Sequence, residues 1–291
     1  MTDSLALVQT TDFFTPIVDD PWTFGAIAAA NAMSDVYAMG GDVRFALNIA
    51  VFPERMPASV STAILAGGAA KVQEAGGVIA GGHTITSLEP IYGLSVAGEV
   101  DPRRVWTKAG ARPGDVVLLS KRIGTGVIST ALKNQAIPPS AGEAATASML
   151  TLNRAASELG RSFPVSSCTD ITGYSLAGHA HEVATRSGVR LVIEATAIPL
   201  LDNAITAVEL GQIPGGLTRN QRYFAGQGVR LAAGISPHLA TLCFDPQTSG
   251  GLFFTLPLEA AAEFERESTL QGLPLWRIGT VTDGEGVEFL P

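Results

Sequence analysis

Three aspartates in this 291-residue chain lie where a carboxylate could hold a metal ion. Asp12 follows an apolar strand and two threonines, Asp35 lies in a helix of small and apolar residues, and Asp170 closes an apolar strand before a glycine turn. A carboxylate in such surroundings is costly unless it is paired or holds a cation. Mg²⁺ prefers carboxylate, phosphate and water oxygens, so converging aspartates would suit a magnesium–nucleotide complex. Taken singly, each aspartate is better explained as a cap, a turn former or half of an ion pair, and sequence spacing does not establish that they converge.

Two glycine-rich segments could bind phosphate. Residues 81–84 (Gly-Gly-His-Thr) follow a short apolar strand and could offer backbone N–H groups and a hydroxyl. Residues 124–126 (Gly-Thr-Gly) stand between a strand and a helix, where an anion can bind at the helix N-terminus. Neither segment is a P-loop or a dinucleotide fingerprint, so a tight turn is the simpler interpretation of both.

The histidines and cysteines favour packing over catalysis. His179 and His181 are two apart on a predicted helix and do not share a face, which makes a zinc site improbable. Cys168 and Cys243 lie in predicted apolar strands, where a thiol is usually inert. Two cysteines without a CxxC pair give no disulfide framework, so a reducing cytoplasm is expected.

The charge balance excludes some partners. The net charge is -8 and no Lys/Arg cluster stands out, so nucleic acid and anionic membrane surfaces are poor candidates. The first residues are not a signal peptide, and no apolar run approaches the ~20 residues that span a bilayer. We therefore expect a soluble cytoplasmic protein.

The pattern of elements predicts two domains, residues 1–107 and 108–291, divided in a proline- and glycine-rich stretch. In the first, strands are expected at 5–8, 44–52, 78–80 and 91–100, and helices at 24–39 and 57–75. Asn31 and Asp35, four residues apart, should share one helix face. In the second, strands are expected at 116–120, 165–170, 189–194 and 252–256, helices at 127–134, 142–159, 176–185, 201–210 and 258–267, a loop region at 213–234, and a final pair of strands around a turn at 277–281 and 287–290.

Five segments in order along the chain resemble the motifs of the selenophosphate synthetase (selenide, water dikinase) family. They are TTDFFTPIVD at 10–19, NAMSDVYAMGG at 31–41, AGGHT at 80–84, CTDITGY at 168–174 and DPQTSGGL at 245–252. Several are long strings with few plausible chance matches, and together they cover nearly the whole chain.

The resemblance implies the two-domain fold of the aminoimidazole ribonucleotide synthetase superfamily. In that fold an α/β N-terminal domain precedes an α+β C-terminal domain, and two chains pair their N-terminal sheets into a β-barrel. It implies a homodimer that converts ATP, selenide and water into selenophosphate, AMP and orthophosphate with Mg²⁺.

The resemblance also implies site residues. Asp12 and Asp35 would contact ATP through Mg²⁺, with Asp35 a direct ligand, and Asp170 would be a further magnesium ligand. Gly82, His83 and Thr84 would reach the ATP of the partner subunit.

Two departures from the family pattern stand out. The family carries a glycine-rich N-terminal segment with a Cys or selenocysteine and a Lys, then a D-D-A-A/S-V stretch, and neither precedes Thr10 in this sequence. A strand so near the start suggests that something precedes it in the natural protein. We thus expect an N-terminally truncated chain without the family's catalytic residues. Ser175 replaces the usual glycine of its turn, where positive φ would be strained.

Two other functions remain open. A chain without the reactive segment could be a non-catalytic ATP-binding or dimerising protein. A superfamily relative, such as a thiamine-monophosphate kinase or a hydrogenase-maturation protein, is less favoured because 10–19 and 245–252 match the selenium branch.

Overall fold

The structure is a computed structural model that describes residues 2–291. The chain forms two compact units: unit 1 is Met1–Val105 with Met149–Arg154, and unit 2 is Trp106–Ser148 with Ala155–Pro291. Among the described residues, none of the helices combines the length and the apolar character needed to cross a bilayer.

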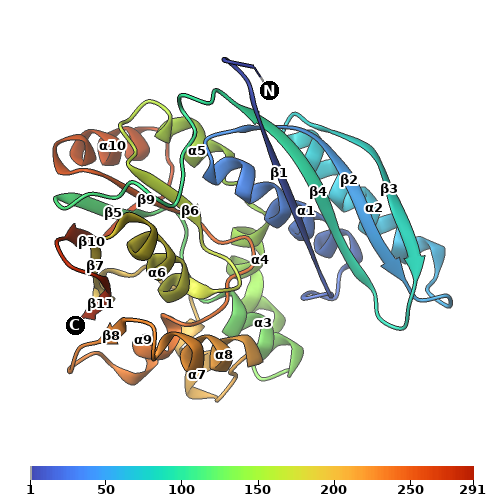
Figure 1. Cartoon of the computed structure of the whole chain (residues 1–291). Coiled ribbons are helices and arrows are strands. Elements are labelled where there is room, and N and C mark those ends of the chain that lie inside the picture. The colour runs from blue at the N-terminus through green and yellow to red at the C-terminus, as the bar shows by residue number, and fades with distance from the viewer. Residues whose placement is uncertain (1) are drawn as a thin grey trace. The chain divides into compact units, whose positions relative to one another are not determined.

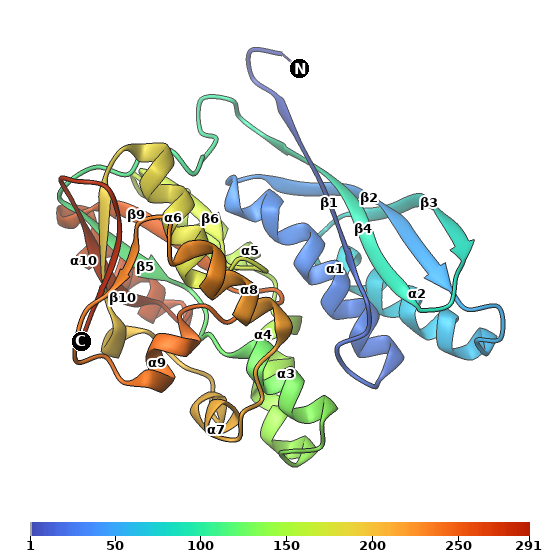
Figure 2. The same cartoon turned by 60° about the horizontal axis from the view of Figure 1, so that its bottom comes forward.

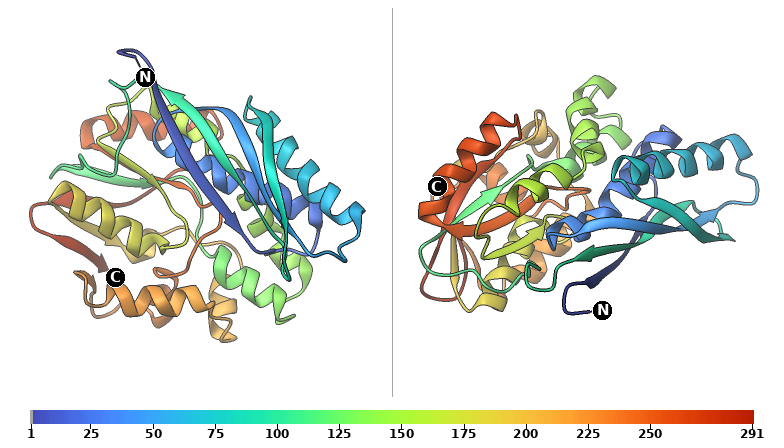
Figure 3. Two further views of the ribbon diagram at one scale, coloured as in Figure 1. Left: turned by 45° about the vertical axis from the view of Figure 1, so that its right-hand side comes forward. Right: turned by 90° about the horizontal axis from the view of Figure 1, so that it is seen from above.

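Unit 1 is a four-stranded sheet with two helices. Its elements are β1 (Ala6–Phe14), α1 (Pro21–Ala38), β2 (Asp42–Phe52), α2 (Ala58–Glu74), β3 (Val78–Thr86) and β4 (Ile91–Val100). The strand order is β1-β4-β2-β3, with β3 parallel to β2 and the other pairs antiparallel. Both helices cover one face of this sheet (Figures 1 and 3).

Helix α1 begins at Pro21, three residues before the predicted start at residue 24. The Asp20 carboxylate accepts a hydrogen bond from the Thr23 N–H at 2.8 Å, and Pro21 occupies the first helical position, where its missing N–H is harmless. Gly40, at a φ of 73°, follows the helix end. The helix is buried along most of its length, which its run of alanines permits without crowding.

The other face of the unit 1 sheet carries exposed apolar side chains. Along β1 the even positions face α1, whereas Leu7 and Phe13 are 62% and 52% exposed. Cross-strand register puts Phe45 and Leu47 of β2 and Ile85 of β3 on the same exposed face. In the part of the chain that the structure describes, β1 and β3 are open edges, so the predicted barrel is not closed within one chain.

Unit 2 is a seven-stranded sheet with flanking helices (Figure 2). The strand order is β6-β9-β5-β10-β7-β11-β8, and only the β7–β11 and β11–β8 pairs are parallel. Its strands are β5 (Asp115–Leu119), β6 (Ser167–Asp170), β7 (Arg190–Glu194), β8 (Val229–Leu231), β9 (Leu252–Pro257), β10 (Trp276–Thr282) and β11 (Gly286–Leu290). Its helices are α3 (Thr125–Lys133), α4 (Glu143–Leu150), α5 (Arg154–Gly160), α6 (Ser175–Ser187), α7 (Ala204–Glu209), α8 (Gly215–Phe224), α9 (Pro237–Leu242) and α10 (Leu258–Leu270), with short 3₁₀ turns at Pro139–Gly142 and Ala195–Ala197.

The long helix predicted at 142–159 is wrong, because it breaks into α4 and α5. Between them, Leu152 is buried in the hydrophobic core of unit 1, and Asn153 Nδ2 donates a hydrogen bond to Ser34 Oγ at 2.9 Å. The chain leaves its helical path to make these contacts, which local helix propensity does not reveal.

Two further predictions for unit 2 are wrong. Residues 213–234 contain α8 and β8 instead of a loop; Leu217, Asn220 and Phe224 form the buried face of α8 behind a glycine-rich start. The last two strands, β10 and β11, do not pair with each other, because β7 lies between them and pairs with both. Neighbouring strands in sequence need not be neighbours in a sheet.

Candidate functional site

Asp12 and Asp35 come together on unit 1, where β1 packs on α1. From the sequence, Asp12 is expected to follow a strand. Strand β1 extends through Phe14, so Asp12 lies within the strand. Asn31 Nδ2 donates to Asp12 Oδ2 at 3.1 Å, and Thr10 Oγ1 donates to Asp35 Oδ2 at 2.5 Å. The predicted shared face of Asn31 and Asp35 therefore points at β1.

The electrostatics of this pair favour a cation. Burial and, to a lesser extent, the negative charge of Asp35 raise the pKa of Asp12 to about 6, against the lowering effect of the Asn31 hydrogen bond. Two carboxylates this close repel each other, and a divalent cation would relieve that repulsion. Magnesium commonly uses one or two carboxylates plus phosphate oxygens, which fits the oxygen donors here. Within residues 2–291 there is no group of three or more His, Cys, Asp or Glu that could hold a metal ion.

The glycine-rich segment at 81–84 is part of strand β3, so the tight-turn interpretation is wrong, whereas its contact with phosphate stays a prediction. It pairs with β2 along an exposed sheet edge, with Gly82 opposite Asn48 and His83 opposite Ile49. A Cβ on Gly82 would lie 2.4 Å from the Asn48 carbonyl oxygen, and its φ is 155°. The glycine is therefore required for β3 to approach β2 closely.

Asp170 lies in unit 2, at the end of β6 and 3% exposed. It pairs with Leu252 at the start of β9, and the next residue, Ile171, donates its N–H to the Gly251 carbonyl at 2.9 Å. The turn after Asp170 is thereby joined to the 245–252 segment. The convergence of Asp170 with the unit 1 carboxylates remains a prediction.

The N-terminus of α3 is filled by side chains of the 245–252 segment and not left open for an anion. Gln247 Oε1 accepts the N–H groups of Gly124 and Thr125 at 2.9 and 3.1 Å, and Asp245 Oδ2 accepts that of Gly126 at 3.0 Å. Burial raises the pKa of Asp245 to about 7, against the lowering effect of these hydrogen bonds. The anion-site interpretation of 124–126 is therefore wrong, and sequence reasoning missed Asp245 and Gln247 as its internal caps.

Both cysteines are buried, as their apolar surroundings predicted. Cys168 lies in β6, but Cys243 follows helix α9 and not a strand. Burial raises the pKa of each thiol, to about 12 for Cys243 and well above its ordinary value for Cys168, where Asp170 adds to the effect. Neither thiol is poised to act as a thiolate.

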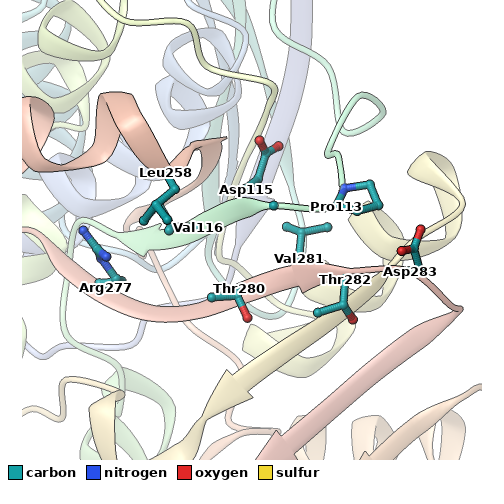
Figure 4. A pocket seen from close by; sticks show the side chains of 10 residues that line it. Pro113, Asp115, Val116, Leu258, Arg277, Thr280, Val281, Thr282 and Asp283 are labelled. Atoms are coloured by element: carbon teal, nitrogen blue, oxygen red, sulfur yellow. The ribbon is translucent and has the colours of Figure 1, made fainter.

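Unit 2 also carries an open pocket of about 440 Å³ (Figure 4). Arg277 and Leu258 lie toward one end, and Pro113 and Asp283 toward the other. Asp115, also in its lining, pairs with the end of β9, whereas Asp170 pairs with its start. The pocket is thus at the opposite end of the strands from Asp170.

Comparison with known proteins shows the family. The family models for the AIR synthase related protein, N-terminal domain and C-terminal domain, match residues 1–100 and 112–290. Selenide, water dikinase 2 of Peptoclostridium acidaminophilum is 46% identical over 93% of this chain and 77% of that relative. Selenide, water dikinase of Citrifermentans bemidjiense is 43% identical over 99% of this chain and 83% of that relative. The chain belongs to the selenide, water dikinase family. Membership in that family confirms the resemblance drawn from the five motifs.

Solved structures of other proteins have the same two-unit fold as this member of the selenide, water dikinase family. Thiamine-monophosphate kinase from Stenotrophomonas maltophilia has a TM-score of 0.77 at 19% identity, covering 98% of this chain and 85% of that one. The hydrogenase maturation protein HypE in complex with ATP has a TM-score of 0.71 at 20% identity, covering 97% and 78%. At these identities the likeness concerns the fold alone.

Proposed function

We propose that this chain makes selenophosphate from ATP, selenide and water, releasing AMP and orthophosphate, with MgATP held against Asp12 and Asp35. The observation that carries the proposal is this carboxylate pair, in a chain 42–47% identical to selenide, water dikinases. The raised pKa of Asp12, caused mainly by burial and also by the charge of Asp35, marks a carboxylate whose ionised form a bound cation would stabilise.

The proposed roles are those that the resemblance to the family implies. Asp35 is a direct magnesium ligand, Asp12 contacts ATP through the same ion, and Asp170 supplies a further ligand. Thr10 and Asn31 orient the first two carboxylates by the hydrogen bonds they donate. Mg²⁺, when bound, neutralises phosphate charge and bridges phosphate to carboxylate, which is most of what phosphoryl transfer requires.

We also propose a homodimer. Asp12 pairs with Leu94, Leu94 with Asn48, and Asn48 with Gly82, so three strand spacings, ~14 Å, separate Asp12 from Gly82. Gly82, with its neighbours His83 and Thr84, is therefore too far away to bind the same phosphates within one chain. A second copy, covering the exposed apolar face of the sheet and completing a β-barrel, would give these residues the partner's ATP to contact.

A second candidate is ATP binding without selenium chemistry. The observation that favours it is the burial of both Cys168 and Cys243, which leaves no accessible thiolate among the described residues. Free thiols fit a reducing compartment, so we propose the cytoplasm for either function.

Phosphorus NMR of the chain with ATP, Mg²⁺ and selenide under anaerobic reducing conditions tests the proposal. We expect selenophosphate and AMP from the wild type. The D35N variant should lose at least about tenfold in rate, since even outer ligands of a metal site are worth 10- to 100-fold. The D3N variant, which alters an exposed carboxylate, is the matched control. ATP that binds but stays intact would support the second candidate.

A further inference from the structure

The turn that follows Asp170 is held by a buried histidine. His179, on the second turn of α6, reaches back so that its Nε2 accepts the Thr172 backbone N–H at 3.1 Å. The Thr172 hydroxyl lies 3.2 Å from the same nitrogen. The ring is 4% exposed, and Tyr174 packs edge-on against it at 6.0 Å between centroids. The bond is thus shielded from water and directed at the residue two positions after Asp170.

This contact defines the state of the imidazole. Because Nε2 accepts an amide N–H, the ring proton must be on Nδ1. Burial lowers the pKa of His179 to about 3, helped by the positive charge of Lys108, so the ring stays neutral. Nδ1 is buried and has no hydrogen-bond partner. An unsatisfied buried N–H costs ~1–3 kcal/mol, so a purely stabilising role does not explain why a histidine occupies this position.

The other bonds to the turn show what the histidine completes. The Thr172 carbonyl accepts the Gln247 N–H at 3.1 Å, and the Gly173 carbonyl accepts Asn220 Nδ2 at 3.0 Å. His179 supplies the acceptor for the remaining Thr172 N–H. Together these bonds fix the chain from the end of β6 to the start of α6, and so the direction in which Asp170 leaves its strand.

We propose that His179 is a positioning residue for the metal site at Asp170, acting through its hydrogen bond to the Thr172 backbone. The inference rests on the proposed function, in which Asp170 is a magnesium ligand. A neutral acceptor suits this role, because it orients the turn without adding a positive charge that would compete with the cation.

The test compares two substitutions of similar size in the 291-residue chain. H179Q keeps an acceptor oxygen near the place of Nε2, whereas H179M removes it. H181Q, on the same helix but bonded to Thr185, is the control. Binding of Mn²⁺ with AMPPCP is followed by electron paramagnetic resonance, and ¹⁵N NMR of the metal-free wild type reports the tautomer of His179.

We expect the Nδ1-protonated tautomer, Mn²⁺ affinity ~10- to 100-fold weaker in H179M, and affinity within about threefold of wild type in H179Q and H181Q. Equal losses in H179Q and H179M, or unchanged affinity in H179M, would overturn the inference. D170N separates the two proposals. If D170N weakens Mn²⁺ binding and H179M does not, only the role of His179 is wrong. If D170N has no effect, the metal assignment of Asp170 fails, and the role of His179 fails with it.

Discussion

Replacing Asp12 by Asn should make the metal-free protein more stable above about pH 6, while weakening its binding of MgATP. In the wild type, burial and the nearby charge of Asp35 both disfavour the ionised form of Asp12. Asn cannot ionise, and its side-chain oxygen can still accept the Asn31 hydrogen bond. The substitution therefore removes the repulsion but keeps the packing.

The magnitude follows from the pKa. The pKa of Asp12 rises from 3.8 to about 6. At ~1.4 kcal/mol per pKa unit, ionisation in the folded state costs ~3 kcal/mol. Asp12 is only partly buried, so screening by water lowers this to ~1–2 kcal/mol. The folded-state pKa lies above the unfolded one, so protonated Asp12 favours the folded state. The stability that this protonated carboxyl contributes is fully present below about pH 4 and is lost as the pH rises through about 6.

The assay is urea unfolding of wild type, D12N and the control D3N from about pH 4 to pH 8 in the presence of a chelator. The difference between D12N and wild type should grow with pH and level off above about pH 7, while D3N should follow the wild type. Saturating MgATP should reverse the order, because the cation stabilises only the charged Asp12. Parallel pH curves for wild type and D12N would show that the pKa of Asp12 is not raised in the folded state and would refute this reasoning.

Two further predictions concern other parts of the chain. Ser175 has a φ of 71°, a conformation that costs a residue with a Cβ ~1–2 kcal/mol. Glycine removes this strain but has greater freedom in the unfolded chain, so S175G should stabilise unit 2 by a net ~0.5–1 kcal/mol. A lower melting temperature for S175G in calorimetry would mean that the 3.5 Å bond from the Gly178 N–H to the Ser175 hydroxyl contributes more than its length suggests. L47D places a charge on the exposed sheet face and should halve the mass measured by light scattering while the circular dichroism spectrum is unchanged. L270D, at a position of unit 2 that is also exposed, should leave the mass unaltered, and a dimeric L47D would argue against that face as the interface.

Sequence reasoning named the candidate carboxylates but not the side chains that bond to them. The four-residue spacing of Asn31 and Asp35 correctly gave one helix face, because helical periodicity is local. That Asn31 bonds Asp12, and Thr10 bonds Asp35, depends on how β1 packs against α1. Such packing is set by the register of β1 on β4, which no local pattern records.

The glycines misled the prediction in two places for the same reason. Glycine favours turns when only the local chain is considered. Gly82 instead serves a close approach to Asn48 on the neighbouring strand, and Gly215 starts a helix whose buried face is marked by Leu217 and Phe224. The spacing of those two apolar residues was a helical signal within the sequence, whereas the contact of Gly82 with Asn48 was not.

The two proposed metal-binding regions favour a bound cation for different physical reasons. On unit 1, Asp12 and Asp35 lie close enough to repel each other, so the fold holds a charge imbalance that a cation would relieve. On unit 2, the turn after Asp170 is held by His179, Asn220 and the backbone of Gln247, which are all neutral. Neutral groups fix geometry without supplying a counter-charge, so these bonds do not lower the attraction of Asp170 for a cation. Lys or Arg at position 179 would not anchor the turn, because neither side chain can accept the Thr172 N–H, and either would add a positive charge that competes with the cation.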